Sequence, residues 1–180
     1  MGEKKVIGRL HVYIGYGKGK STAALGLLLR AVGQGHRVLY GQFLKSGRSG
    51  ELLSLPQLGE NVRIWPTSSV EKFYRNLSEA EQEDVKNAQR ASLAEMAAEM
   101  REGSYNLAIM DEALDLIDLG IVTAAELVDL ARNRPEATEL VYTGHNAGPE
   151  IVAAADYLTE FHARKHPYNE GVPARRGIEF

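Results

Sequence analysis

A glycine-rich segment with two lysines, GYGKGKST at residues 15–22, constrains the fold of this chain more than any other feature. It follows an apolar stretch of strand length at residues 8–14 and leads into a run rich in Ala and Leu at residues 21–32. Glycines let the backbone turn its N–H groups inward, and the start of a helix adds unpaired N–H groups with a partial positive charge. The segment therefore predicts a loop that binds the phosphates of a nucleotide.

The polar residues of this loop have separate expected roles. Lys20 is expected to reach the phosphates, and the hydroxyl of Ser21 or Thr22 to bind Mg²⁺. The spacing departs from the usual G-x-x-x-x-G-K-[ST] pattern, because Ile14 stands where that pattern has its first glycine. A second cation, Lys18, lies between two glycines. The alternative interpretation is a glycine-rich turn whose lysines are merely exposed.

Apolar runs of strand length alternate with longer helical patterns, which predicts βαβ units around a mainly parallel sheet in an α/β layer fold. Ser78 with Glu81, and Thr123 with Glu126, match the capping-box pattern and predict two helix starts. The expected strands are residues 8–14, 38–43, 62–65, 105–110, 139–143 and 157–161, the expected helices are 21–32, 78–102, 113–119, 123–134 and 149–155, and long loops are expected at 45–50 and 66–77 before an irregular tail from residue 165.

Composition limits the functions open to the chain. Its 180 residues suit one domain, and 44% hydrophobic with 25% charged residues is typical of a globular protein. A net charge of −3 supplies no broad positive field for nucleic acid or an anionic membrane. The absence of cysteine excludes disulfides, thiol nucleophiles and thiolate metal sites. Because the sequence shows neither a signal-peptide pattern nor a long apolar run, we expect a cytoplasmic protein without membrane contact.

Two neighbouring acids, Asp111 and Glu112, follow the apolar run at residues 105–110. An acid at the carboxyl end of a strand that neighbours the phosphate loop is well placed to hold Mg²⁺ or its bound water. The alternative is that either acid caps the short helix expected next. Taken together with the loop, the pair favours a magnesium site.

The segment GYGKGKST followed by AALGLLLRAVGQG resembles the opening of the ATP:corrinoid adenosyltransferases of the cobalamin pathway. The resemblance continues in the same order over nearly the whole chain. It includes Gln42, Phe43, Lys45, Gly50, Glu51, Asp111, Glu112, Thr143, Gly144, Lys165, His166, Gly171, Val172 and residues 177–180. The closing motifs make it much more specific than the loop alone.

This resemblance implies a three-layer P-loop fold with a RecA-like parallel sheet, usually in a homodimer. It implies that a reduced corrinoid, cob(I), attacks the ribose 5′ carbon of ATP, and that inorganic triphosphate leaves whole. A reductase must supply the electrons that produce cob(I). Two lysines in one loop together with Mg²⁺ suit the charge that builds up on the departing triphosphate.

Residue roles also follow from the resemblance. Lys18, Lys20 and Glu112 would serve catalysis, Ser21 and Glu112 would ligate Mg²⁺ with Asp111 as the further candidate, and Arg30 would reach the nucleoside. The corrinoid would contact Lys45, Glu51, Phe73 and Tyr74. ATP would be held by Gly15, Tyr16, Gly17, Lys18, Gly19, Lys20, Ser21 and Thr22.

Two departures from the family pattern bear on function. The family often has Gly-Arg after the threonine of the fifth strand, where this chain has Gly144 and His145. The aromatic residues of the loop after the third strand are displaced to Phe73 and Tyr74. The five histidines show no metal-ligand spacing, although His166 is an alternative lower ligand to cobalt.

Two other functions are compatible with the same loop and acids. A P-loop kinase or ATPase would act on the γ-phosphate and yield ADP. A non-catalytic nucleotide-dependent corrinoid-binding protein would bind ATP without turning it over.

Overall fold

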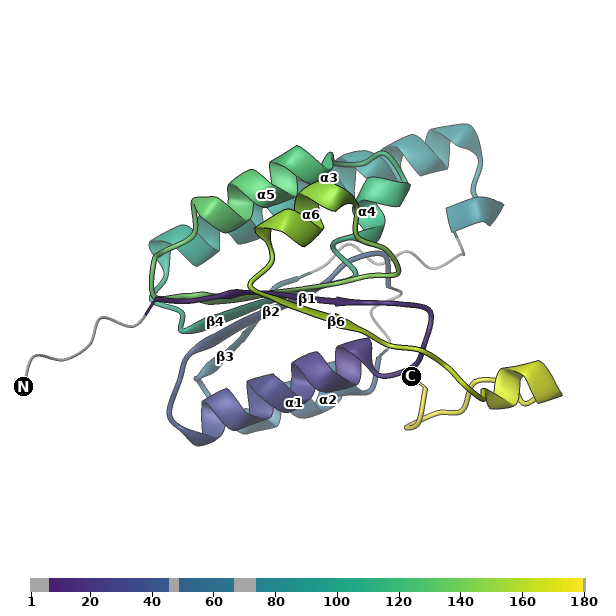
Figure 1. Cartoon of the computed structure of the whole chain (residues 1–180), viewed down its shortest axis with the longest axis horizontal. Coiled ribbons are helices and arrows are strands. Elements are labelled where there is room, and N and C mark those ends of the chain that lie inside the picture. The colour runs from purple at the N-terminus through teal and green to yellow at the C-terminus, as the bar shows by residue number, and fades with distance from the viewer. Residues whose placement is uncertain (1–6, 46–48, 67–73, 180) are drawn as a thin grey trace, which may run out of the picture.

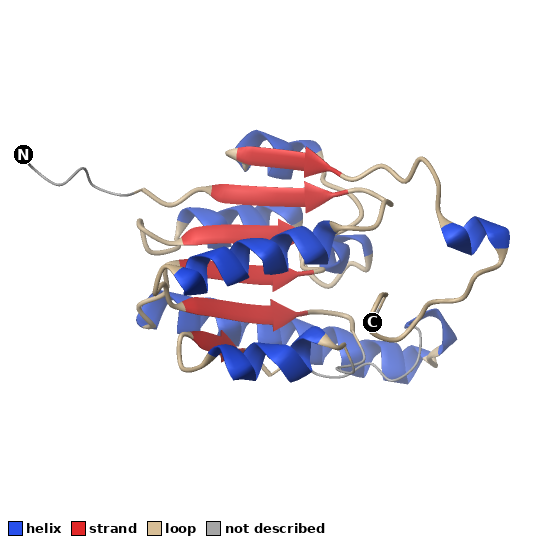
Figure 2. Ribbon diagram, turned by 90° about the horizontal axis from the view of Figure 1, so that it is seen from below, coloured by secondary structure: helices blue, strands red, loops and turns tan. Residues whose placement is uncertain are grey.

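The described residues form six strands in one parallel sheet, in the order β3-β2-β4-β5-β1-β6. The computed structural model describes residues 7–45, 49–66 and 74–179. Figure 2 shows the strands pointing the same way. The predicted α/β class and the six predicted strands are confirmed, with ends within two residues of the expected ones. The strands are β1 Leu10–Ile14, β2 Val38–Gln42, β3 Val62–Ile64, β4 Leu107–Asp111, β5 Glu139–Thr143 and β6 Tyr157–Glu160.

Helices cover both faces of this sheet and complete a three-layer fold (Figure 1). On one face lie α1 Lys20–Gly33 and α2 Glu51–Ser54, and on the other α3 Glu79–Glu102, α4 Asp115–Asp118, α5 Ala124–Arg132 and α6 Pro149–Ala154. One apolar core lies between the sheet and the helices on each of its two faces. Ala24 and Leu28 of α1 pack in one core, and Met96 and Leu127 pack in the other. Covering both faces explains why β2 and β4 are buried along their whole length.

The strand order corrects one expectation about the site. The strand that carries the two acids, β4, is not a neighbour of β1, because β5 pairs with both and lies between them. In a parallel sheet all carboxyl ends meet at one edge, so the residues after β1, β5 and β4 still converge. The end of β5, at Thr143, therefore lies between the loop and the acids.

Short elements account for most of the remaining differences. The segment after the expected loop 45–50 forms α2 and a 3₁₀ helix, Leu55–Leu58, neither of which the sequence analysis predicted. The tail, expected to be irregular, contains a 3₁₀ helix at Pro167–Glu170, and a third such helix spans Tyr74–Asn76. One turn of helix is too short to show a hydrophobic period, so these elements are set by their surroundings.

The edge strand β6 is exposed to solvent, and the long helix α3 is rich in polar residues. All four residues of β6 are exposed, including Tyr157 and Leu158. The 24-residue helix α3 has a polar composition. Within the described ranges, no helix combines the length and the apolar character that crossing a membrane requires.

We predict that Thr123→Ala lowers the free energy of unfolding by about 1 kcal/mol. The Thr123 hydroxyl accepts a hydrogen bond from the Glu126 N–H, and the Glu126 carboxylate accepts from the Thr123 N–H in return, so the change removes the reciprocal cap of α5. Urea denaturation measures the loss. Thr159→Ala, on the exposed strand β6, is the matched control, and an equal loss in both variants would contradict the capping role.

Candidate active site

The phosphate loop is closed by its own lysine. Lys20, the first residue of α1, donates from Nζ to the carbonyl oxygens of Gly15 and Gly17, at 2.6 and 3.3 Å. Gly15 and Gly19 adopt φ values of +112° and +128°, which side chains disfavour. The ammonium thus lies across the loop, at the start of a helix whose unpaired N–H groups attract anions. Phosphate oxygens could replace the two carbonyls as its partners.

The glycines of this loop are also required by a neighbouring segment. The N–H of Gly17 donates to the carbonyl of Phe161, the residue after β6, at 2.8 Å. A Cβ atom would come within 2.4 Å of that carbonyl oxygen at Gly15 and within 2.5 Å at Gly17. The chain leaving β6 therefore packs directly on the loop and fixes its shape. The sequence gives no sign of this contact.

Asp111 is the centre of the polar cluster beside the loop, and it is fully buried at the end of β4. Its Oδ1 accepts from the Ser21 hydroxyl at 2.9 Å and from the Thr143 hydroxyl at 2.6 Å. Its Oδ2 accepts from Lys45 Nζ at 2.5 Å. The first turn of α1 and the segments ending β2, β4 and β5 are thereby tied to one carboxylate.

The ammonium group of Lys45 is surrounded by oxygen atoms of four side chains. Besides Asp111, its Nζ lies 3.4 Å from the Ser21 hydroxyl and 3.8 Å from a carboxylate oxygen of each of Glu51 and Glu112. Burial alone would lower the pKa of Lys45, but the three carboxylates outweigh it and raise the pKa, so the ammonium stays charged. The cluster is therefore built around a cation.

The donor set of this cluster fits Mg²⁺. Hydroxyl and carboxylate oxygens are the ligands that this hard cation prefers, and Ser21, Asp111 and Glu112 provide them. In the described residues no group of three or more His, Cys, Asp or Glu side chains is arranged to hold a metal by itself. Mg²⁺ in nucleotide sites needs only one or two carboxylates, since phosphates and waters complete its shell.

Glu112 stands in an unusual backbone conformation. Its φ is +63°, and its N–H donates to the Thr143 hydroxyl at 2.8 Å. Burial raises the pKa of its carboxyl group to about 7; the negative charges of Asp111 and Asp115 act in the same direction, while Lys45 and Lys20 oppose them. A non-glycine residue with positive φ is often found at a functional site. Leu44, next to Lys45, has a φ of +59°.

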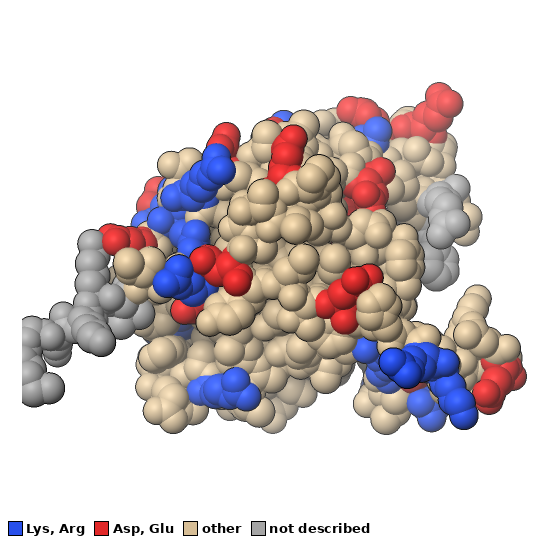
Figure 3. Space-filling view, in the orientation of Figure 1, with Lys and Arg blue, Asp and Glu red and all other residues tan. Residues whose placement is uncertain are grey.

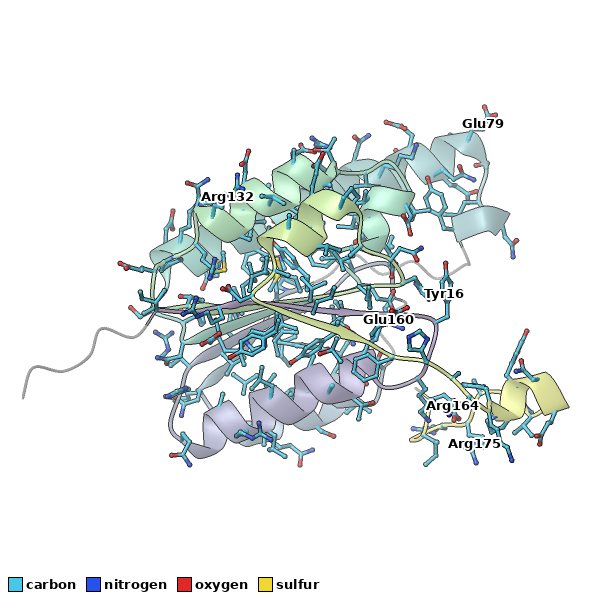
Figure 4. The ribbon with its side chains drawn as sticks, in the orientation of Figure 1. Tyr16, Glu79, Arg132, Glu160, Arg164 and Arg175 are labelled. Atoms are coloured by element: carbon cyan, nitrogen blue, oxygen red, sulfur yellow. The ribbon has the colours of Figure 1, made fainter. Side chains whose placement is uncertain are left out.

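Lys18 is held by the C-terminal segment. After β6 the chain leaves the sheet and turns back toward the carboxyl ends of the strands (Figure 2). There a Glu179 oxygen lies 3.0 Å from Lys18 Nζ. Hydrogen bonds from Arg175, then from Lys18, lower the pKa of Glu179 to about 2. Lys and Arg side chains gather on this segment (Figure 3), which carries Arg164 and Arg175 (Figure 4).

With this geometry established, comparison with protein-family models gives a match over residues 7–180 to the family described as ATP:corrinoid adenosyltransferase BtuR/CobO/CobP. The chain belongs to this family. The resemblance inferred from the sequence motifs is thereby confirmed, and the family is one of transferases.

Three relatives show how far the likeness extends. A corrinoid adenosyltransferase of Sinorhizobium sp. is 30% identical over 186 residues, covering 96% of this chain and 80% of its own length. The corrinoid adenosyltransferase of Escherichia coli K12 is 29% identical over 175 residues, covering 96% and 86%. An uncharacterized Nostoc protein is 32% identical over 180 residues, and this chain spans about half, 46%, of its length.

Among solved structures, domain III of the Thermotoga maritima replication initiation protein DnaA gives a TM-score of 0.44 at 14% identity, covering 87% of this chain and 55% of that one. A likeness this weak says nothing about function.

The structure brings most of the predicted site residues together, but Arg30 lies apart from them. This residue is ten positions after Lys20 on α1, about 15 Å along the helix axis at 1.5 Å per residue. It lines a pocket of about 290 Å³ with His11 and Tyr157, near the amino-terminal ends of the strands. Arg30 therefore lies away from the phosphate loop, and its contact with the nucleoside stays a prediction.

The predicted corrinoid contacts are divided between two places. Lys45 and Glu51 lie in the acid cluster, where Gln42 Nε2 donates to Glu51 Oε1 at 2.5 Å. Tyr74 is half-buried before α3. Phe73 lies outside the described residues. Their roles toward a corrinoid stay predictions.

Three residues of the site were not assigned a role from the sequence. Thr143 was noted only as a family match, yet its hydroxyl bonds both Asp111 and the N–H of Glu112. Its place at the end of an expected strand could have revealed it. Phe161 and Asp115 contact the site through tertiary packing, for which the sequence holds no signal.

We predict that Glu112→Gln becomes more stable relative to wild type as pH rises. The pKa of Glu112 in the folded state, about 7, lies above its ordinary value of 4.5, so folding favours the protonated form. That favourable contribution is present below about pH 4.5 and is lost as pH rises through about 7. Denaturation without Mg²⁺ at about pH 5 and about pH 8 should show a relative gain of about 2 kcal/mol for the variant. Equal pH profiles would contradict the raised pKa.

We also predict that Glu179→Gln strengthens the binding of ATP about two- to fivefold, because it frees Lys18 from an exposed ion pair. Calorimetric titration with ATP and Mg²⁺ measures the effect, which should shrink at high salt. Glu170→Gln, in the exposed 3₁₀ helix of the same segment, is the matched control. Unchanged affinity in Glu179→Gln would show that Lys18 does not meet the phosphates.

Proposed function

We propose that this chain transfers the 5′-deoxyadenosyl group of ATP to the cobalt of a reduced corrinoid and releases inorganic triphosphate, in the biosynthesis or salvage of adenosylcobalamin. The observation that carries the proposal is the buried Asp111 cluster, which joins Ser21 of the phosphate loop to Lys45 in a chain that matches the adenosyltransferase family over residues 7–180. The relatives named as corrinoid adenosyltransferases support the same reaction.

In this reaction an electron pair of cob(I) forms the cobalt–carbon bond as the bond between the ribose 5′ carbon and its oxygen breaks. The electrons of the broken bond leave with the triphosphate, so negative charge grows on that group. Fixed positive charges placed where charge develops lower the barrier most. Lys20, with Lys18 beside it, meets this requirement from the loop side.

Lys20 acts in the proposal by exchanging the carbonyls of Gly15 and Gly17 for phosphate oxygens. Thr143 keeps Asp111 in place, since its hydroxyl bonds one oxygen of that carboxylate. Glu112, which has a positive φ and whose N–H donates to Thr143, is the second carboxylate beside Asp111. Lys20 would bind the triphosphate directly, and the other residues keep the acidic side in place; none of them transfers a proton.

Ser21 and Asp111 would hold Mg²⁺, with Glu112 as the third oxygen donor. When bound, Mg²⁺ would supply positive charge to the leaving triphosphate. Lys45 already holds a positive charge against Asp111, so it can keep the carboxylate in position before the metal arrives. Lys45 and Glu51 are proposed to face the corrinoid as well, together with Tyr74 and Phe73.

The resemblance supports further proposals about the protein's surroundings. We infer a homodimer, a cytoplasmic location and a reductase that supplies electrons for cob(I).

The test is a reaction of the protein with ATP, Mg²⁺ and chemically reduced cobalamin under anaerobic conditions. The expected products are adenosylcobalamin, followed by its absorbance, and inorganic triphosphate, identified by ion chromatography. ADP and phosphate with no adenosylated corrinoid would instead assign the site to a P-loop ATPase. ATP binding with no product of either kind would assign it to a nucleotide-dependent binding protein.

We predict that Lys20→Ala reduces kcat/KM for ATP at least about 100-fold, because it removes a charge from the leaving triphosphate. Arg132→Ala is the control, since it removes a cation at the far end of α5, away from the loop (Figure 4). Both variants should melt at the wild-type temperature. Full activity of Lys20→Ala would refute the phosphate-loop assignment.

A further inference from the structure

A histidine and a buried aspartate face each other at the carboxyl edge of the sheet, beside the phosphate loop. Asp115, in the first turn of α4, is buried, and its Oδ1 accepts from the backbone N–H of His145 at 2.8 Å. The same oxygen lies 3.0 Å from His145 Nδ1. The histidine side chain is 48% exposed, so the ring is held on one side and open on the other.

The position of His145 is fixed against the loop itself. Its carbonyl oxygen accepts from the N–H of Gly15 at 2.9 Å. Its ring lies 5.2 Å from the ring of Tyr16, which is exposed on the loop. The hydroxyl of Tyr16 accepts from Asn146, the next residue, at 3.1 Å. Three contacts therefore hold the segment after β5 against the phosphate loop.

The strand order places the segment after β5 next to both parts of the site. Because β5 lies between β1 and β4, its carboxyl end faces both the loop and the acids. Thr143, two residues before His145, already bonds Asp111. A side chain that continues from this strand end stands beside the space between the loop and the Asp111 cluster, which is where a triphosphate held by Lys20 and Ser21 would lie.

Asp115 has a further property that a purely structural loop anchor does not need. Its second oxygen, Oδ2, is buried without a hydrogen-bond partner in the described part of the chain. A buried carboxylate is costly unless a positive charge faces it. An imidazole whose Nδ1 faces this carboxylate directs Nε2 away from it, toward the open side of the ring.

We propose that His145 contacts the triphosphate of ATP and donates a hydrogen bond from Nε2 to its oxygens, with Asp115 as the positioning residue that orients the ring. This inference rests on the proposed function, in which triphosphate is the leaving group. It adds a donor on the β5 side of the site, opposite the lysines of the loop. Its effect should be larger on the departing triphosphate than on intact ATP, because the leaving group carries more charge.

The first experiment measures the binding of inorganic triphosphate with Mg²⁺ by calorimetry. His145→Gln removes the imidazole and should weaken binding about tenfold or more, as expected for a hydrogen bond to a charged group. His145→Arg places a cationic donor at the same position and should restore most of the affinity. His36→Gln, an exposed histidine in the pocket near the other edge of the sheet, is the matched control and should bind as wild type.

The second experiment separates positioning from structural anchoring. Asp115→Asn retains an oxygen that can accept from the His145 N–H but loses the charge that faces the ring. It should weaken triphosphate binding in the wild-type background and have little effect in His145→Arg, whose cation does not depend on the ring orientation. An equal loss in both backgrounds would make Asp115 a loop anchor only.

Wild-type binding of triphosphate by His145→Gln, with an unchanged melting temperature, would overturn the proposal. If wild-type protein forms no adenosylated corrinoid while His145→Gln still binds triphosphate about tenfold more weakly, the phosphate contact stands and the proposed reaction fails. If adenosylation proceeds equally well in His145→Gln, the reaction stands and the contact fails.

Discussion

The structure of the site depends on one buried carboxylate, Asp111. Burying a charge without compensation costs far more than a single hydrogen bond returns, so the fold must bring partners to it. Ser21, Thr143 and Lys45 meet this demand from the first turn of α1 and from the ends of β5 and β2. Any shift of these elements relative to each other would break part of the cluster. The carboxylate thus couples the sheet register to the shape of the site.

Parallel strands make such a convergence possible. Their carboxyl ends lie at one edge, and β5 separates the strand of the phosphate loop from the strand of the acids. The end of β5, with Thr143 and His145, therefore lies between the loop and the carboxylates.

The cations of the site are paired with groups of the protein itself. Lys20 bonds carbonyls of the loop, Lys45 bonds Asp111, and Lys18 pairs with Glu179. Phosphate oxygens would have to replace the protein partners of Lys20 and Lys18, and Mg²⁺ would compete with Lys45 for Asp111. The buried pair of Lys45 should resist exchange more than the exposed pair of Lys18, since water screens the latter.

The sequence by itself determined the strands, the main helices, the phosphate loop and the family, because these depend on local signals: alternating apolar residues, capping boxes, glycines and motif spacing. It placed Ser21, Asp111 and Glu112 at the right ends of their elements. Only the tertiary structure decided that Arg30 lies away from the loop, that Phe161 requires the loop glycines, and that Asp115 faces His145. The reason is physical: these facts depend on strand order and on contacts between residues far apart in the chain, and no local preference encodes either.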